Sequence, residues 1–269
     1  MSLRCGVNVP TFGEFADIRL LAQLAASAEE SGWDGFFLWD HVVWPWAEEA
    51  ADPWIALTAV ALHTQHIRIG PLVTPLPRRR PQKVARETVS LDRLSGGRLT
   101  LGAGSGAFPQ EFDDLGEPAT DARTRAAVLD ESLAVLAGLW SGETFSFSGA
   151  HHRVHQARFL PAPVQRPRIP VWVGGQWPLR GPLERALRWD GYVPLKGTPV
   201  PFSKSEVADI AHRVGLADRP GFDLVISDRD GNPADYAAAG ATWWVDTPPP
   251  WDISLPEVRD RIAAGPPRL

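Results

Sequence analysis

Cysteine is almost absent from this sequence. Cys5 is the sole cysteine among 269 residues, so no intrachain disulfide can form and a cysteine-based zinc site is excluded. The sequence also lacks an apolar run of about 18 residues, the length that a membrane-spanning helix needs. Its first residues lack the extended apolar stretch of a signal peptide. We therefore expect a cytoplasmic protein that does not use a membrane as a partner.

Clusters of basic residues are also scarce. The net charge is -5 and the pI is near 5.8, and the only dense basic cluster in the sequence is "PRRRP" at residues 77–81. An acidic protein of this kind is poorly suited to nucleic acid, so we expect no such partner. Tryptophan, in contrast, is abundant, with twelve residues. This abundance suggests a site with flat, apolar walls.

Strand-like and helix-like segments alternate along the chain. Short apolar runs predict eight strands, at residues 4–9, 35–40, 67–76, 98–104, 169–175, 191–195, 222–227 and 241–246. Helical periodicity and capping signals predict helices at residues 17–32, 52–65, 83–97, 120–140, 183–187, 205–214, 233–239 and 255–263.

Alternating β and α units require parallel strands, and eight such units close a barrel. We therefore predict an α/β fold, a (β/α)8 TIM barrel that forms a single domain over residues 1–269. A doubly wound open sheet is the alternative. Residues 142–167 alternate apolar and polar side chains and predict a β-hairpin or extended excursion between the fourth and fifth strands.

Functional side chains of such barrels lie where the strands end, on the C-terminal face. The second strand ends with Asp40 and His41 in "FFLWDHVVWPW". An imidazole can exchange a proton near neutral pH, and Asp40 could fix either its tautomer or the neighbouring backbone, so both are candidate catalytic residues. A packed core histidine is the alternative interpretation.

Glycine and proline mark the ends of three further strands. The third strand continues as "GPLVTPLPRRRP", whose prolines impose a rigid and irregular backbone. Gly104 ends the fourth strand, where glycine lets the backbone approach a ligand closely. Gly174 and Gly175 end the fifth strand and precede a helix, whose free N–H groups and dipole would attract a phosphate. Turn formation alone also explains each pattern.

Three histidines of the predicted hairpin raise the question of a metal. His151, His152 and His155 form the pattern "HHRVH" without a nearby acidic or cysteine residue. We therefore predict that no metal is bound there, and that these histidines are solvated or packed.

Several segments resemble the bacterial luciferase-like family of flavin-dependent oxidoreductases. They are "GWDGFFLWDH", "IRIGPLVTPLPRRRP", "ARETVSLDRLSGGRLTLGAGSG", "FLPAPVQRPRIPVWVGG" and "RWDGYVP". Together they extend over most of the chain, in the order that the family has. The resemblance implies a (β/α)8 barrel, a flavin at its C-terminal mouth, reaction with oxygen or a small organic substrate, and a homodimer.

The resemblance also implies roles for individual residues. A non-proline cis peptide bond of this family lies against the flavin ring, and Leu72–Val73 is the matching bond. His41 matches a histidine near the reactive edge of the flavin. Ala107, however, stands where the sugar-phosphate dehydrogenases of the family place a catalytic glutamate. The implied cofactor-binding residues are Leu72, Val73, Thr74, Gly104, the phosphate turn Gly174 and Gly175, and Lys196, which matches a phosphate-binding lysine of deazaflavin relatives.

The leading hypothesis is an FMN-dependent oxidoreductase that acts as a monooxygenase on a small apolar or aromatic substrate, with electrons supplied by hydride transfer or by a separate flavin reductase. The expected walls of the substrate pocket are Trp39, Trp44, Trp46 and Trp177. One alternative is hydride transfer with coenzyme F420, an 8-hydroxy-5-deazaflavin. Another is a flavin-binding barrel without turnover.

Overall fold

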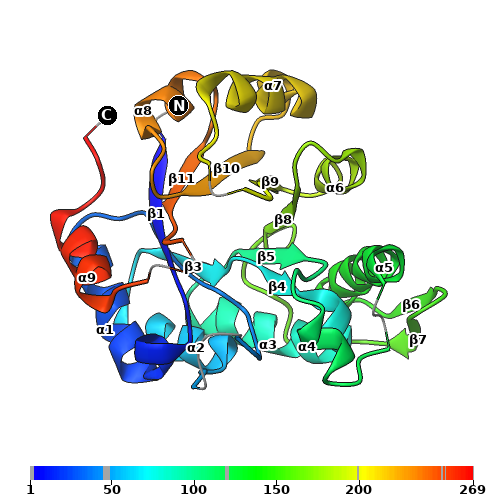
Figure 1. The fold of residues 1–269 in the computed structure, drawn as a ribbon. Coiled ribbons are helices and arrows are strands. Elements are labelled where there is room, and N and C mark those ends of the chain that lie inside the picture. The colour runs from blue at the N-terminus through cyan, green and yellow to red at the C-terminus, as the bar shows by residue number, and fades with distance from the viewer. Residues whose placement is uncertain are drawn as a thin grey trace.

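The computed structural model describes residues 3–44, 49–118, 121–198, 200–249, 251 and 253–268. In this part of the chain, nine strand segments form one parallel sheet in the order β3-β2-β1-β11-β10-β9-β8-β5-β4 (Figure 1). The segments are β1 (Arg4–Val9), β2 (Gly35–Leu38), β3 (Arg68–Pro71), β4 (Thr74–Pro75), β5 (Leu101–Gly104), β8 (Val171–Gln176), β9 (Gly191–Leu195), β10 (Asp223–Asp228) and β11 (Trp243–Asp246).

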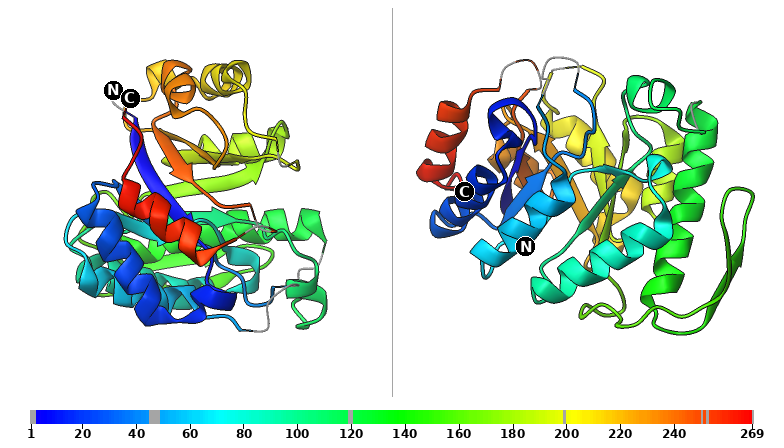
Figure 2. Two further views of the ribbon diagram at one scale, coloured as in Figure 1. Left: turned by 60° about the vertical axis from the view of Figure 1, so that its left-hand side comes forward. Right: turned by 90° about the horizontal axis from the view of Figure 1, so that it is seen from below.

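Helices surround these strands on the outside, as Figures 1 and 2 show. The α-helices are α1 (Ile18–Glu30), α2 (Pro53–His63), α3 (Pro81–Leu94), α4 (Gln110–Asp113), α5 (Ala122–Trp140), α6 (Arg180–Ala186), α7 (Lys204–Val214), α8 (Pro233–Ala238) and α9 (Leu255–Ala264). Short 3-10 helices are η1 (Gly13–Ala16), η2 (Leu76–Arg78) and η3 (Leu216–Asp218).

The predicted third strand is divided into β3 and β4. β3 pairs with β2, β4 pairs with β5, and the Leu72–Val73 peptide bond between them is cis, as the resemblance implied. A parallel bridge between Ile69 and Leu99 connects the two ends of the sheet. The nine segments therefore occupy eight positions of a nearly closed barrel. The predicted (β/α)8 barrel is confirmed, and the doubly wound open sheet is wrong.

Side-chain caps explain where the helices begin. The Asp52 carboxylate accepts hydrogen bonds from the backbone N–H groups of Trp54 and Ile55, at 2.9 and 3.0 Å, and Pro53 occupies the first turn. Thr120, the first residue of the predicted fourth helix, lies outside the described residues. In the structure Asp121 caps α5, with its carboxylate accepting from the Thr124 N–H at 2.9 Å.

The excursion between the fourth and fifth barrel strands is a β-hairpin, as predicted. β6 (Phe145–Ser148) and β7 (Arg153–Ala157) pair antiparallel, and Figure 2 shows the hairpin at the edge of the molecule. Partly buried side chains of both strands pack against the main core, among them Phe145 and Val154. The hairpin therefore forms a separate sheet outside the barrel, where it covers part of the helical layer.

Aromatic side chains fill the barrel interior. Phe37, Trp172 and Trp243 are fully buried, with ring centroids 5.3 to 6.0 Å apart. The abundance of tryptophan is therefore largely a property of the core. The buried core tryptophans are Trp33, Trp54, Trp140, Trp172, Trp243 and Trp244. The expectation that tryptophan content reflects a flat-walled site was wrong for these residues.

Candidate functional site

The end of β2 lies beside the divided third strand. The Leu72 N–H donates to the Leu38 carbonyl at 2.8 Å, and the Thr74 hydroxyl donates to the Asp40 carboxylate at 2.7 Å. Side chains alternate along a strand, so Trp39 faces the same side as the interior residue Phe37. The structure thus brings together, at the barrel mouth, the candidate residues of the second and third strands.

Asp40 is a buried anchor for η2. Its carboxylate accepts hydrogen bonds from Nη2 of Arg78 and of Arg79, at 2.6 and 2.7 Å. Burial raises the pKa of Asp40, but the nearby Arg79 and Arg78 guanidinium groups outweigh burial and leave this pKa below its usual value. Both oxygens are occupied by Thr74 and the two arginines. Of the two roles expected for Asp40, these contacts agree with holding its neighbours in place, and within the described residues it has no hydrogen bond to His41. A catalytic role of Asp40 stays a prediction.

Glu111 makes the contact that we had expected from Asp40. Its Oε2 lies 3.2 Å from Nδ1 of His41, and its Oε1 accepts the Val42 N–H at 2.7 Å. Nη2 of Arg78 lies 3.8 Å from the same Oε1. Burial raises the pKa of Glu111, but the hydrogen bond and charge of His41 and the charge of Arg78 lower it below its usual value.

The ionised Glu111 decides which nitrogen of His41 carries a proton. An ionised carboxylate can only accept hydrogen bonds, so Nδ1 of His41 is the donor. In the neutral ring, Nε2 then carries a lone pair. Within the described residues Nε2 has no hydrogen-bond partner. His41 can therefore accept or donate a proton through Nε2 while Glu111 holds the ring in place.

Sequence reasoning missed Glu111 because 70 positions separate it from His41. The residue lies in α4, just beyond the glycine-rich end of β5. A signal was present: an acidic residue between Phe108 and Phe112 follows a predicted strand end directly. A charged residue among aromatic ones at that position indicates a buried carboxylate with a partner at the mouth.

Aromatic rings enclose His41 on several sides. The ring centroids of Trp44 and Phe108 lie 4.9 and 5.1 Å from that of His41, and Trp39 lies at 6.4 Å. Phe12 stacks on Trp44 at 4.2 Å. Trp39 and Trp44 thus lie beside His41, together with Phe12 and Phe108, which the sequence did not indicate. That the two tryptophans form the walls of a substrate pocket stays a prediction. Trp46, the third expected tryptophan of this stretch, lies outside the described residues.

Trp177 and Lys196 have other partners. The Arg213 guanidinium of α7 lies 5.1 Å from the Trp177 ring, which packs against the main core. Nζ of Lys196 donates to Glu206 at 2.8 Å and to the Pro201 carbonyl at 2.9 Å. Trp177 is therefore placed in the helical layer, apart from the rings around His41, and the Lys196 charge is already compensated by a carboxylate.

Three of the candidate glycines are explained by close packing. A Cβ at Gly104 would lie 2.7 Å from a methyl group of Val73, and a Cβ at Gly174 would lie 3.0 Å from its other methyl. A Cβ at Gly175 would lie 2.2 Å from Cβ of Pro182 in α6. Gly104 and Gly174 thus make room for Val73 beside the cis bond, whereas Gly175 permits α6 to approach β8. Phosphate binding by Gly174 and Gly175 stays a prediction.

Among the buried polar atoms that lack partners within the described residues, two lie in or directly after strands that end at the mouth. They are Nε1 of Trp39, a donor, and Oδ1 of Asn8, an acceptor at the end of β1. Nδ2 of Asn8 donates to the Thr247 hydroxyl at 3.5 Å, which orients the amide. The edge of a flavin-type ring carries both N–H and carbonyl groups. The residues present therefore fit such a ring, and Val73, Trp39 and His41 would lie beside it.

The described part of the chain was compared with the requirements of a metal site and of a membrane-spanning helix. No group of three or more histidine, cysteine, aspartate or glutamate side chains there is arranged to hold a metal ion. No helix among these residues combines the length and the apolarity needed to span a bilayer.

The geometry defines a parallel (β/α)8 barrel with a histidine–carboxylate pair at the C-terminal mouth. Residues 4–230 match the family described as luciferase-like monooxygenase, and the chain belongs to this family. An F420-dependent glucose-6-phosphate dehydrogenase of Nakamurella multipartita is 32% identical over 183 residues, 66% of this chain and 52% of that protein. A protein of the same description from Beutenbergia cavernae is 35% identical over 164 residues, 59% of this chain and 46% of that protein.

This chain spans about half the length of these curated relatives. Solved structures share its fold at lower identity. An F420-dependent secondary alcohol dehydrogenase in complex with an F420-acetone adduct has a TM-score of 0.75 at 15% identity, over 92% of this chain and 94% of that chain. The oxygenating constituent of 3,6-diketocamphane monooxygenase from Pseudomonas putida, in complex with FMN, has a TM-score of 0.69 at 20% identity, over 85% of this chain and 67% of that chain.

Proposed function

We propose that this chain is an oxidoreductase that binds a flavin-type cofactor at the barrel mouth and uses His41 for proton transfer to or from a small apolar or aromatic substrate. The observation that carries the proposal is the His41–Glu111 pair beside the Val73 segment. A histidine held by a buried carboxylate, with its second nitrogen free, is suited to acid–base catalysis near neutral pH.

Each neighbouring side chain would contribute to this reaction. When bound, the cofactor supplies the transfer of an electron pair as hydride or the activation of oxygen. Val73 would support its ring, and Trp39 and Trp44 would exclude water and contact an apolar substrate. Glu111 would stabilise the protonated imidazole of His41 and keep Nε2 oriented.

Monooxygenation with FMN is the first candidate reaction, because the aromatic enclosure of His41 suits an apolar substrate. Hydride transfer with coenzyme F420 is the second, and a specific observation favours it. The two relatives compared above, each more than 30% identical, are described as F420-dependent. Glucose 6-phosphate itself is a poor candidate substrate, because Ala107 replaces the glutamate implied at that position. Homodimer formation and a separate flavin reductase stay predictions.

A cofactor titration distinguishes the candidates. The protein is purified from a host that lacks coenzyme F420, and FMN and F420 are titrated separately, in oxidised and reduced forms, with tryptophan fluorescence as the readout. Tight binding of reduced FMN with oxygen-dependent product formation supports the first reaction. Selective binding of F420 supports the second. Binding without turnover of any offered substrate supports the flavin-binding barrel, and binding of neither cofactor contradicts the proposal.

The His41 role needs its own matched control. His41→Ala is compared with His63→Ala on α2, an exposed histidine whose Nδ1 lies 2.8 Å from the Ala59 carbonyl. We expect both variants to bind the cofactor, and only His41→Ala to slow turnover. Equal turnover in the two variants would contradict the proposed proton transfer.

A further inference from the structure

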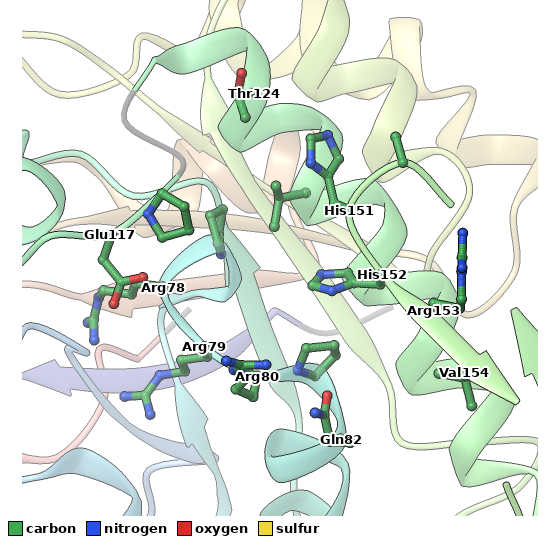
Figure 3. A pocket seen from close by; sticks show the side chains of 15 residues that line it. Arg78, Arg79, Arg80, Gln82, Glu117, Thr124, His151, His152, Arg153 and Val154 are labelled. Carbon is green, nitrogen blue, oxygen red and sulfur yellow. The ribbon is translucent and has the colours of Figure 1, made fainter. Parts of the chain in front are cut away.

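A cavity of about 720 Å³ lies outside the barrel mouth, between the η2–α3 segment, the beginning of α5 and the turn of the β6–β7 hairpin. Figure 3 shows the side chains that line it. Arginine dominates the lining, with Arg78, Arg79 and Arg80 on one wall and Arg153 on the hairpin wall, whereas Glu117 is the acidic residue among the described lining residues. This composition contrasts with the net charge of -5 of the whole chain.

The positive charge of this cavity is only partly compensated. Asp40 binds both Arg78 and Arg79, and Glu111 lies 3.8 Å from Arg78. Nε of each of these arginines is buried and has no hydrogen-bond acceptor. Among the described residues, the guanidinium groups of Arg80 and Arg153 have no hydrogen bond or ion pair. Both residues are exposed, so water screens their charges in part, and an anion between them would gain charge-assisted hydrogen bonds from both.

The walls of the cavity are fixed in place. Glu131 of α5 accepts three backbone N–H groups of the hairpin turn, from Ala150 at 2.7 Å, His151 at 2.9 Å and His152 at 2.8 Å. The His152 ring is held by Ser132, with Nε2 2.9 Å from the hydroxyl, and Figure 3 shows it extending toward the segment of Arg80. Glu131 is therefore engaged by the backbone, so its charge holds the turn and leaves Arg153 unpaired.

We propose that this cavity is a binding site for a small, multiply charged anion that carries phosphoryl or carboxylate groups. Arg80 and Arg153 would contact it from opposite walls, with His152 between them. Guanidinium groups bind such oxygens through charge-assisted, often bidentate hydrogen bonds. The depressed pKa of His152 agrees with this environment: burial lowers it most, Glu131 raises it, and the positive charges of His151 and Arg80 lower it further.

Isothermal titration calorimetry on the full chain without cofactor tests the site, so the result does not depend on the proposed oxidoreductase function. Inorganic phosphate and citrate are titrated separately in a chloride buffer, which distinguishes phosphoryl from carboxylate recognition. We expect saturable binding of at least one of them. Histidine NMR resonances should shift at His152 during the same titration and remain unchanged at His63.

Two arginine variants provide the decisive comparison. Arg80→Gln should weaken binding by about tenfold, the effect of losing one charge-assisted hydrogen bond. Arg259→Gln removes the same charge from α9, on the opposite side of the molecule in Figure 1, and should leave affinity within about twofold. If Arg80→Gln lowers thermal stability, Arg153→Gln replaces it in the comparison. Absence of saturable binding for both anions, or equal affinity in the Arg80 (or Arg153) and Arg259 variants, would overturn the proposal.

Discussion

Replacement of Asp40 by asparagine tests the central electrostatic feature of the mouth. In the structure this carboxylate is the shared partner of Arg78 and Arg79 and also accepts the Thr74 hydroxyl. Asparagine preserves the size of the side chain and one acceptor oxygen. The substitution therefore removes the negative charge while leaving the packing of η2 against β2 nearly unchanged.

The expected loss of stability in Asp40→Asn follows from the burial of Arg78 and Arg79. The Arg78 side chain is 4% exposed and that of Arg79 is 15% exposed, so water compensates little for the lost charge. Removal of one partner from a buried ion pair costs about 3–5 kcal/mol, because the remaining charge stays buried. Glu111 still lies 3.8 Å from Arg78, so we expect the lower end, about 3 kcal/mol, for Asp40→Asn.

Urea denaturation at pH 7, followed by circular dichroism and tryptophan fluorescence, measures this loss. The matched control is Asp209→Asn on α7, which breaks an exposed pair with Arg213 and should cost less than about 0.5 kcal/mol. A loss below about 1 kcal/mol for Asp40→Asn, or one equal to the control, would refute the assignment of Asp40 as a buried anchor. A catalytic role without structural importance would then regain support.

Three further predictions concern the same region. His41→Ala should retain the fold and cofactor affinity while steady-state turnover falls by about 10²–10⁴-fold, the usual effect of losing an acid–base group; unchanged turnover would return His41 to a packing role. The folded-state pKa of Glu111 lies below the usual 4.5, so its contribution to stability is complete above pH 4.5 and is lost as the pH falls through the folded-state value. Between pH 7 and 3, the free energy of unfolding measured with urea should therefore fall less in Glu111→Gln than in the unmodified protein. Equal decreases in the two proteins would contradict this. Gly104→Ala should lower the free energy of unfolding by about 1–3 kcal/mol, because its Cβ would lie 2.7 Å from a methyl of Val73, and an unchanged urea midpoint would show that the mouth accommodates the added atom.

The barrel could be predicted from the sequence because each of its units carries a local signal. Apolar runs such as "GFFLWD" mark strands buried on both faces, and Asp52 followed by Pro53 marks a helix start. The division of the third strand into β3 and β4, in contrast, had no local signal in the sequence. Its cis bond followed from the family resemblance, since residues 67–76 read locally as one continuous strand.

The site was only partly predictable, because its contacts join distant residues. His41 and Trp44 were found because they belong to the stretch in which strand two ends. Glu111 was missed because no local pattern connects it to His41 across 70 positions. Trp177 was assigned to the pocket from its position after a strand end, but the neighbouring helix α7 supplies Arg213 as its partner. The composition shows that the chain is rich in aromatic side chains, but it does not show whether a given ring lies in the barrel interior, in the helical layer or at the mouth.

The buried aromatic layer of the barrel has a consequence for the direction from which ligands can enter. Phe37, Trp172 and Trp243 occupy the interior, and below them the first residues of β1 and β10 form the Arg4–Asp223 ion pair. The Arg4 guanidinium lies 4.5 Å from the centre of the Trp243 ring, which seals this end further. The interior is therefore closed at this end and open at the C-terminal mouth. Under the proposed function, cofactor and substrate would both enter through that mouth, so the one bound deeper would enter first and leave last.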